Sequence, residues 1–174
     1  HRLLVLARKP APIQISWLGY PNTTGLSAID FRLTDAIADP EGKSEKFYTE
    51  ELLRLPGCFL CYSGNQKAII SSCSAYENNG HVTFGSFNNL AKVTPEVVKV
   101  WAEILRRVPD SNLLIKSGNS GGIPKRYIDI FKEQGITSNR LKLHSFIPDV
   151  DLHLALYNKI DIGLDPFPFN GATT

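Results

Sequence analysis

The chain has 174 residues, of which 43% are hydrophobic and 21% are charged. This composition provides enough apolar side chains for a core and excludes a disordered chain. The 19 basic and 17 acidic residues leave a net charge of +2, which is too balanced to predict a nucleic-acid or membrane surface, so anion recognition is expected to be local. No apolar stretch approaches the ~18 residues of a membrane span.

The first segment, residues 1 to about 62, contains two runs that are rich in β-branched and aromatic residues. "IQISWLG" (13–19) and "FRLTD" (31–35) are predicted strands, and the turn-rich loop "GYPNTTGLSAID" (19–30) joins them. "KSEKFYTEELLRL" (43–55) predicts a helix that ends before Pro56 and Gly57.

Residues 63–80 are polar and small without periodicity, which indicates a linker. From residue 81 the chain alternates strands and helices. The predicted strands are residues 81–88, 112–117, 140–146 and 161–165, and the predicted helices start at Thr94 as a cap, at Pro124 (to Gln134) and at Asp149. In the first helix one buried face is predicted from the spacing of Val97, Val100, Trp101, Ile104, Leu105 and Val108.

This β-α-β-α-β-α-β order, with strands that are apolar on both faces, predicts an α/β fold. Its sheet should be parallel, with helices on both faces. Ligands of such sheets bind beyond the carboxyl ends of the strands. The loops after residues 88, 117, 146 and 165 are therefore the expected place for a site.

The three cysteines are Cys58, Cys61 and Cys73. Their odd number indicates reduced thiols and a cytoplasmic setting. The C-x-x-C pair, with Cys73 and His81 after it, raises the question of a zinc site, but its spacing fits no standard zinc knuckle. "CFLCY" (58–62) instead predicts a short buried strand with thiols packed in a core.

The loop after the first strand of the second segment supplies Asn88, Asn89 and Lys92 just before a helix N-terminus. Free N–H groups, the helix dipole and a lysine together suit an anion such as a diphosphate. The alternative is a solvated lysine beside two turn asparagines. His153, one turn into the third helix, is either a ligand contact or an ordinary surface or core histidine.

Two further patterns have a structural and a functional interpretation. Asp149 and Asp151 spell D-x-D, a metal-binding pattern of some glycosyltransferases, but their position at a helix start favours capping. In the terminal "FNGATT", Gly171 allows close backbone approach, and Thr173 and Thr174 could offer hydroxyls to a phosphate. The alternative is a strand-to-helix turn with a threonine cap. "SGNSGG" (117–122) fits neither a dinucleotide fingerprint nor a Walker A loop, so it is expected to be a connection.

One known family has three segments that match this chain in order and spacing: "RKPAPIQISWLGYPNTTG", "VTFGSFNNLAKVTPEVVKVWAEILRRVPDSNLLIKS" and "LYNKIDIGLDPFPFNGATT". Over nearly its whole length the chain resembles the catalytic region of the protein O-GlcNAc transferases, including their plant SPINDLY-like branch. The resemblance implies a GT-B transferase, with a sugar nucleotide bound between two Rossmann-like lobes. Residues 1–62 would be the end of the first lobe, 63–80 a linker and 81–174 the start of the second lobe, so the chain is expected to be a fragment.

The resemblance also implies roles for individual residues. Lys92 matches the lysine that contacts the donor diphosphate and steadies the leaving group, and Asn89 stands at a glutamine position. His153 matches a histidine beside the nucleoside. Thr173 and Thr174 match the paired threonines that hold the phosphates. The implied cleft loop, beside donor and acceptor, is Gly19, Tyr20, Pro21, Asn22, Thr23, Thr24 and Gly25. Ala172 and Val150 depart from the animal pattern, which has a histidine and a lysine at these positions.

The implied activity is transfer of GlcNAc from UDP-GlcNAc to Ser or Thr hydroxyls of proteins, with inversion and with neither a metal nor a cofactor. The general base is not assigned, because the family's candidate histidines lie upstream of residue 1. The isolated 174 residues are expected to lack turnover. Tetratricopeptide repeats are expected upstream in the full-length protein, and nucleic acid and membrane partners are not.

Three alternatives compete with this function. The donor could be GDP-fucose, as in the SPINDLY-like branch, and the Asn22-Thr23-Thr24 sequence of the loop is closer to that branch. The chain could also belong to a non-catalytic, transferase-like scaffold. A dinucleotide oxidoreductase shares the βαβ rhythm, but no strand here is followed by a glycine fingerprint and a ribose-binding acid.

Overall fold

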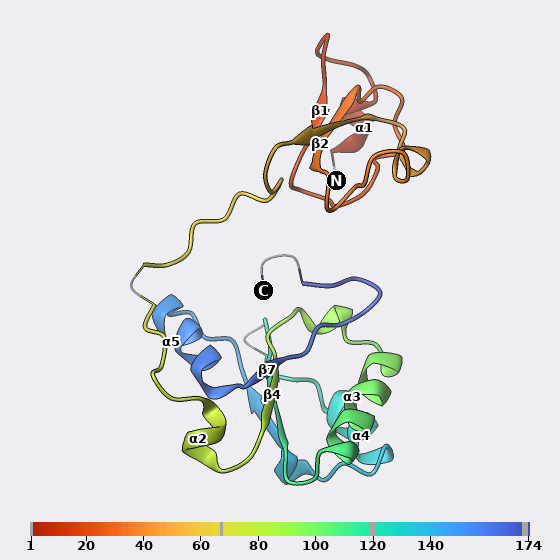
Figure 1. The fold of residues 1–174 in the computed structure, drawn as a ribbon. Coiled ribbons are helices and arrows are strands. Elements are labelled where there is room, and N and C mark those ends of the chain that lie inside the picture. Colours follow the sequence, from red (N-terminus) through yellow and green to blue (C-terminus); the bar gives the residue numbers. More distant parts are fainter. Residues whose placement is uncertain (1, 67, 119–120, 172–173) are drawn as a thin grey trace. The chain divides into compact units, whose positions relative to one another are not determined.

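The computed structural model describes residues 2–66, 68–118, 121–171 and 174, which form two compact units (Figure 1). The N-terminal unit is residues 1–64 and the C-terminal unit is residues 65–174. None of the helices in these described ranges is both long enough and apolar enough to cross a bilayer.

The N-terminal unit is built on a three-stranded parallel sheet in the order β1-β2-β3. Its elements are helix α1 (Leu3–Leu6), β1 (Ile15–Ser16), β2 (Phe31–Asp35), the 3-10 turn η1 (Glu45–Phe47) and β3 (Glu51–Leu55). The strand predicted at 31–35 is confirmed, and the strand predicted at 13–19 shortens to two residues.

The helix predicted over 43–55 is wrong. Its first part forms only η1, and its second part is the strand β3, which pairs with β2 over five residues from Phe31↔Glu51 to Asp35↔Leu55. Helix propensity in "EELLRL" is a weak preference, and the hydrogen bonds of a sheet override it.

The expectation of buried thiols is also wrong. Cys58, Cys61 and Cys73 are all exposed, and "CFLCY" forms no strand. After Pro56 and Gly57 the chain leaves the sheet, so no neighbouring strand covers the segment.

The C-terminal unit has a four-stranded parallel sheet in the order β6-β5-β4-β7. Its strands are β4 (Thr83–Ser86), β5 (Asn112–Lys116), β6 (Leu141–His144) and β7 (Ile162–Gly163). Its helices and 3-10 turns are α2 (Ala75–Asn79), η2 (Leu90–Lys92), α3 (Pro95–Arg107), α4 (Lys125–Glu133), η3 (Ser138–Arg140), α5 (Val150–Ala155) and η4 (Leu156–Lys159). The predicted α/β architecture is confirmed.

Helices cover both faces of this sheet. Helices α3 and α4 lie on one face and α5 on the other (Figure 1). A crossover to the opposite face between β6 and β7 reverses the direction in which strands are added, because β7 pairs with β4 rather than with β6. The carboxyl ends of β4 and β7 therefore lie next to each other where the strand order reverses, which is where open α/β sheets bind ligands.

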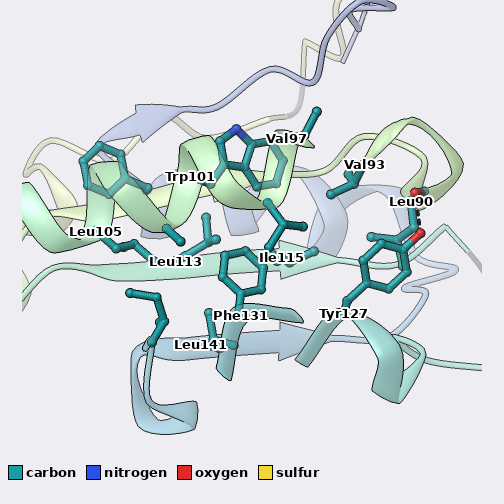
Figure 2. Packing of buried hydrophobic residues seen from close by; sticks show 14 residues of the cluster. Leu90, Val93, Val97, Trp101, Leu105, Leu113, Ile115, Tyr127, Phe131 and Leu141 are labelled. Atoms are coloured by element: carbon teal, nitrogen blue, oxygen red, sulfur yellow. Dashed lines mark hydrogen bonds between the residues drawn. The ribbon is translucent and has the colours of Figure 1, made fainter. Parts of the chain in front are cut away.

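The main core lies between α3, α4 and the sheet (Figure 2). Trp101 and Leu105 of α3 pack in the same cluster as Phe131 of α4, and all three are at most 2% exposed. Each such side chain contributes about 1.5–3 kcal/mol by leaving water. The predicted face of α3 is correct except at Val100, which is 46% exposed, whereas Val98 is fully buried.

Local capping sets the helix ends. Thr94 accepts a hydrogen bond from the backbone N–H of Val97, as predicted for the start of α3. A capping box of Ser74 and Glu77 starts α2, which lies inside the stretch expected to be a linker. Gly135 ends α4 at φ +80°, a conformation that side chains other than glycine rarely adopt.

Candidate functional site

The candidate site is a cavity of about 190 Å³ at the carboxyl edge of the C-terminal sheet. It is lined by residues of β4 and β7, of the turn η4, and by Gly171 and Thr174 of the C-terminal tail (residues 166–174). Its lining includes Ser86, Phe87, Asn88, Tyr157, Asp165, Gly171 and Thr174. A larger hollow of about 500 Å³ lies beside α4 and the turn after it, away from the ends of the strands.

Asp165, two residues after β7, organises one wall of this cavity. Its Oδ1 accepts hydrogen bonds from Nδ2 of Asn88 (3.1 Å) and from the backbone N–H of Gly171 (2.8 Å). A Cβ on Gly171 would come within 2.5 Å of Oδ1 of Asn88, so only glycine fits here. One carboxylate thus joins the loop after β4 to the tail.

Two buried polar atoms in this wall have no hydrogen-bond partner among the described residues. They are Oδ1 of Asn88 and Oγ of Ser86. Buried polar groups in folded proteins are nearly always paired, and an exception calls for an explanation such as a ligand. Both residues line the cavity, so polar groups of a bound ligand could pair with these two atoms.

Lys92, the last residue of η2, lies against the tail. Its Nζ donates to the carbonyl of Asn170 (2.9 Å) and is 4.3 Å from the ring centroid of Phe169. Asn89, in contrast, uses its side-chain oxygen to accept from the backbone N–H of Ala91 and so starts η2. The structure therefore gives Asn89 a local capping contact, while its neighbour Asn88 faces the cavity.

His153, in α5, belongs to a cluster of three rings. Its ring centroid is 5.9 Å from that of Phe87 and 5.7 Å from that of Tyr157, both of which line the cavity. Burial, and then the charge of Lys116, lower the pKa of His153 below 6.5, so the ring is neutral at pH 7. Its Nδ1 is buried without a partner among the described residues.

Lys116 is a residue that sequence reasoning missed. It ends β5 and is 6% exposed, and burial lowers its pKa. Within the described ranges its Nζ has no hydrogen-bond or ion-pair partner, and it lies 5.7 Å from the ring centroid of Phe146. A charged residue at the carboxyl end of the apolar strand "NLLIK" was the available signal, because a buried lysine without an acid is unusual.

The tail carries the remaining predicted residues. The backbone carbonyl of Thr174 accepts from the hydroxyl of Tyr157 (2.9 Å). Thr173 and Ala172 lie outside the described residues. Lys92 thus contacts the tail that contains Thr174, and the structure shows no contact between these two residues.

The Asp149-Val150-Asp151 pattern is a helix cap. Oδ1 of Asp149 accepts from the backbone N–H of Leu152 (2.8 Å), and Asp151 lies in the first turn of α5. Where the chain is described, no three His, Cys, Asp or Glu side chains come close enough together to hold a metal ion.

The predicted cleft loop belongs to the N-terminal unit. Gly19, Tyr20, Pro21, Asn22 and Gly25 are exposed, and Thr23 and Thr24 are half-buried. The two threonine side chains donate to the carboxylate of Glu50, and two loop carbonyls accept from the guanidinium of Arg32. Sequence reasoning missed Arg32 and Glu50, because they lie 10 to 27 positions away from their partners.

Known proteins resemble the whole chain. The family model described as "Glycosyl transferase family 41" matches residues 1–68 and 63–174. A Petunia hybrida protein, "Probable UDP-N-acetylglucosamine--peptide N-acetylglucosaminyltransferase SPINDLY", is 46% identical over 100% of this chain and 19% of its own length. The Arabidopsis thaliana protein of the same kind named SEC is 30% identical over 98% of this chain.

A solved structure gives the same result. A mutant O-GlcNAc transferase from Thermobaculum terrenum superposes with a TM-score of 0.85 and is 36% identical, covering 99% of this chain and 32% of its own. The match supports the GT-B assignment. The chain spans about 19% of the length of the SPINDLY relatives. It belongs to glycosyl transferase family 41.

Proposed function

We propose that the protein containing this chain is a protein O-glycosyltransferase, which moves GlcNAc from UDP-GlcNAc to Ser or Thr hydroxyls with inversion and without a metal. The observation that carries the proposal is the 46% identity, over the full chain, to a relative whose name specifies UDP-GlcNAc and a peptide. The carboxyl-edge cavity supports it, because Gly171 and Thr174 of the tail line the cavity and Lys92 contacts the carbonyl of Asn170 in the same tail.

In this proposal the C-terminal unit binds the donor. Transfer leaves negative charge on the departing nucleoside diphosphate, and without a metal a cation and oriented donors must stabilise it. Lys92 supplies the cation, and Thr173 and Thr174 supply hydroxyls and backbone N–H groups. Lys92 would exchange its contact with the carbonyl of Asn170 for the diphosphate.

The neutral ring of His153 would pack beside the nucleoside, and Asn89 would reach the nucleotide through its amide nitrogen, which its capping contact leaves available. Exposed residues of the loop 19–25 would contact the substrates from the N-terminal unit. We also propose that the full-length protein works in the cytoplasm, needs no cofactor beyond the sugar nucleotide, and carries tetratricopeptide repeats outside this chain.

The decisive experiment assays the full-length protein with radiolabelled UDP-GlcNAc and with radiolabelled GDP-fucose on a Ser/Thr peptide. Product from UDP-GlcNAc supports the proposal. Product from GDP-fucose alone would show that the donor is GDP-fucose, as in the SPINDLY-like branch that the Asn22-Thr23-Thr24 sequence resembles.

A matched pair of variants tests the role of Lys92. Lys92→Ala should lower transfer by about 10²–10³-fold, because it removes the cation that stabilises the leaving charge. Lys99→Ala, which removes an exposed lysine from α3 seven positions on, should leave transfer unchanged. Equal transfer by the two variants would contradict the role given to Lys92, and a wild type that transfers neither sugar would favour a non-catalytic, transferase-like scaffold.

A further inference from the structure

The loop from Tyr20 to Gly25 has no regular secondary structure, yet two buried ions of opposite charge hold it. Arg32, on β2, is 1% exposed, and Glu50, directly before β3, is 4% exposed. Fully buried charges are rare in folded proteins unless they are paired. Most of the hydrogen bonds of Arg32 and Glu50 go to the loop, and Nε of Arg32 has no partner among the described residues.

Arg32 holds the backbone of the loop. Its Nη1 donates to the carbonyl of Tyr20 (2.8 Å) and to that of Asn22 (3.1 Å). Its guanidinium carbon lies 5.6 Å from the ring centroid of Tyr48, and no carboxylate of the described residues forms an ion pair with it. The buried cation therefore depends on two carbonyls that it can reach only when the loop is in place.

Glu50 holds the next two residues. Its Oε2 accepts from Oγ1 of Thr23 (2.7 Å), and its Oε1 accepts from both the backbone N–H (2.7 Å) and the hydroxyl of Thr24. Burial raises the pKa of Glu50, but these hydrogen bonds from Thr24 and Thr23 outweigh it and bring the pKa to about 2. The carboxylate is therefore ionised at neutral pH, as charge-assisted hydrogen bonds require.

These contacts divide the loop into anchors and exposed side chains. The hydroxyl of Thr23 donates to Glu50 and accepts from the backbone N–H of Gly25 (3.0 Å), so it is fully used. The hydroxyl of Thr24 donates to Glu50 as well. The side chains of Tyr20, which is 60% exposed, and Asn22 are exposed; Oδ1 of Asn22 accepts from the backbone N–H of Thr23 (2.8 Å), which leaves its amide nitrogen available.

We infer that Arg32 and Glu50 are positioning residues for the transfer reaction, which fix the loop so that Tyr20 and Asn22 contact substrate while Thr23 and Thr24 serve only as anchors. This inference rests on the proposed function. It differs from a general role in stability, because both ions contact the loop itself and because displacement by about 1 Å can cost about 10²-fold in rate.

The first test measures order in the loop without using activity. Amide hydrogen exchange of the full-length protein is compared for the wild type, Glu50→Gln, Arg32→Lys and the control Glu51→Gln, whose side chain is the exposed neighbour. Glu50→Gln should speed exchange at Thr24 about tenfold, because one hydrogen bond of about 1.4 kcal/mol is a factor of ten. Arg32→Lys should also speed amide exchange in the loop, since a lysine lacks the planar set of donors that an arginine has. The control should exchange like the wild type.

The second test separates positioning from binding. Glu50→Gln and Arg32→Lys should lower kcat for peptide transfer about 10–100-fold and leave the KM for the donor within about twofold, because a displaced loop affects alignment more than donor affinity. Thr24→Ser keeps the anchoring hydroxyl and should retain activity, whereas Thr24→Val should resemble Glu50→Gln. Adding Thr24→Val to Glu50→Gln should have little further effect, because both changes break the same contact.

The outcomes distinguish the two proposals. Unchanged exchange in Glu50→Gln and Arg32→Lys overturns the inference, and so does faster exchange with unchanged transfer. A further large loss on adding Thr24→Val to Glu50→Gln also overturns it, since Thr24 would then act on substrate directly. If the wild type transfers neither sugar, the proposed function fails, and the exchange experiment alone decides whether the two ions hold the loop.

Discussion

Asn88 and Asp165 lie 77 positions apart in the sequence and meet at the carboxyl edge of the C-terminal sheet, where Nδ2 of Asn88 donates to Oδ1 of Asp165 at 3.1 Å. The same oxygen holds the backbone N–H of Gly171. The wall of the candidate donor cavity therefore depends on one carboxylate that follows a two-residue strand.

Replacing that carboxylate should disturb both stability and donor binding. Asp165→Ala removes two hydrogen bonds and leaves Nδ2 of the buried Asn88 without its acceptor, which should cost about 1–3 kcal/mol in the free energy of unfolding. Urea denaturation measures this loss, and titration with the nucleoside diphosphate should show weaker binding. Glu133→Ala, in which an exposed acid of α4 is removed, serves as the control. Equal stability of the two variants would contradict the role given to Asp165.

Two glycines that face each other in the sheet offer a second matched pair. Gly85 of β4 and Gly163 of β7 are register partners. A Cβ on Gly85 would lie 2.4 Å from Cγ2 of Ile160, whereas a Cβ on Gly163 would meet no atom within 4 Å. Gly85→Ala should therefore destabilise the protein by about 1–3 kcal/mol through overpacking. Gly163→Ala should not, and thermal unfolding of the two variants tests the difference.

The hydroxyl of Tyr127 links α4 to the turn that carries Lys92. It donates to the carbonyl of Leu90 at 2.6 Å (Figure 2). Tyr127→Phe should cost about 1 kcal/mol, the net value of one hydrogen bond. Tyr76→Phe, at an exposed tyrosine, is the control. If the two variants have the same urea midpoint, the link contributes nothing to the fold.

The half-buried ring of His153 predicts a pH dependence of stability. The pKa of His153 is lowered in the folded protein by burial and by Lys116, so the unfolded chain binds more protons as the pH falls below 6.5. The free energy of unfolding should therefore decrease on acidification through pH 6.5 and level off below the folded pKa. His153→Phe should reduce this slope, measured by urea denaturation at a series of pH values.

A remaining slope is expected from His144. Burial and then Lys159 lower the pKa of His144 in the same direction. The double variant His144→Phe and His153→Phe should therefore show the smallest slope. An identical slope in the wild type and in His153→Phe would show that His153 does not carry the effect.

The periodicity of apolar residues predicted an element correctly where that element buries one face. The apolar spacing from Val97 to Leu105 located α3 and its caps. It misplaced Val100 and omitted Val98, because α3 packs against both the sheet and α4 and its buried face is wider than one stripe. Pairing between strands is not visible in this way. Strand β3 forms because β2 pairs with it over five residues, and no local pattern in "ELLRL" reveals that neighbour.

The candidate site was only partly predictable for the same reason. Motif likeness pointed to Lys92, His153 and the tail; in the structure Lys92 contacts the tail, and His153 lies beside two rings that line the cavity. It could not rank Asn88 above Asn89, because the distinction depends on Asp165, a distant partner. Glu50 and Arg32 were not predicted either, since the sequence alone does not distinguish a buried charged residue from one at the surface when its hydrogen-bond partners are distant.

The exposed cysteines have a practical consequence. Cys58 and Cys61 belong to the N-terminal unit and Cys73 to the C-terminal unit, and all three are accessible to reagents. With Cys61 replaced by serine, maleimide dyes at the other two positions would form a donor–acceptor pair for single-molecule fluorescence. Such a pair would measure the separation of the two labelled residues with and without a sugar nucleotide.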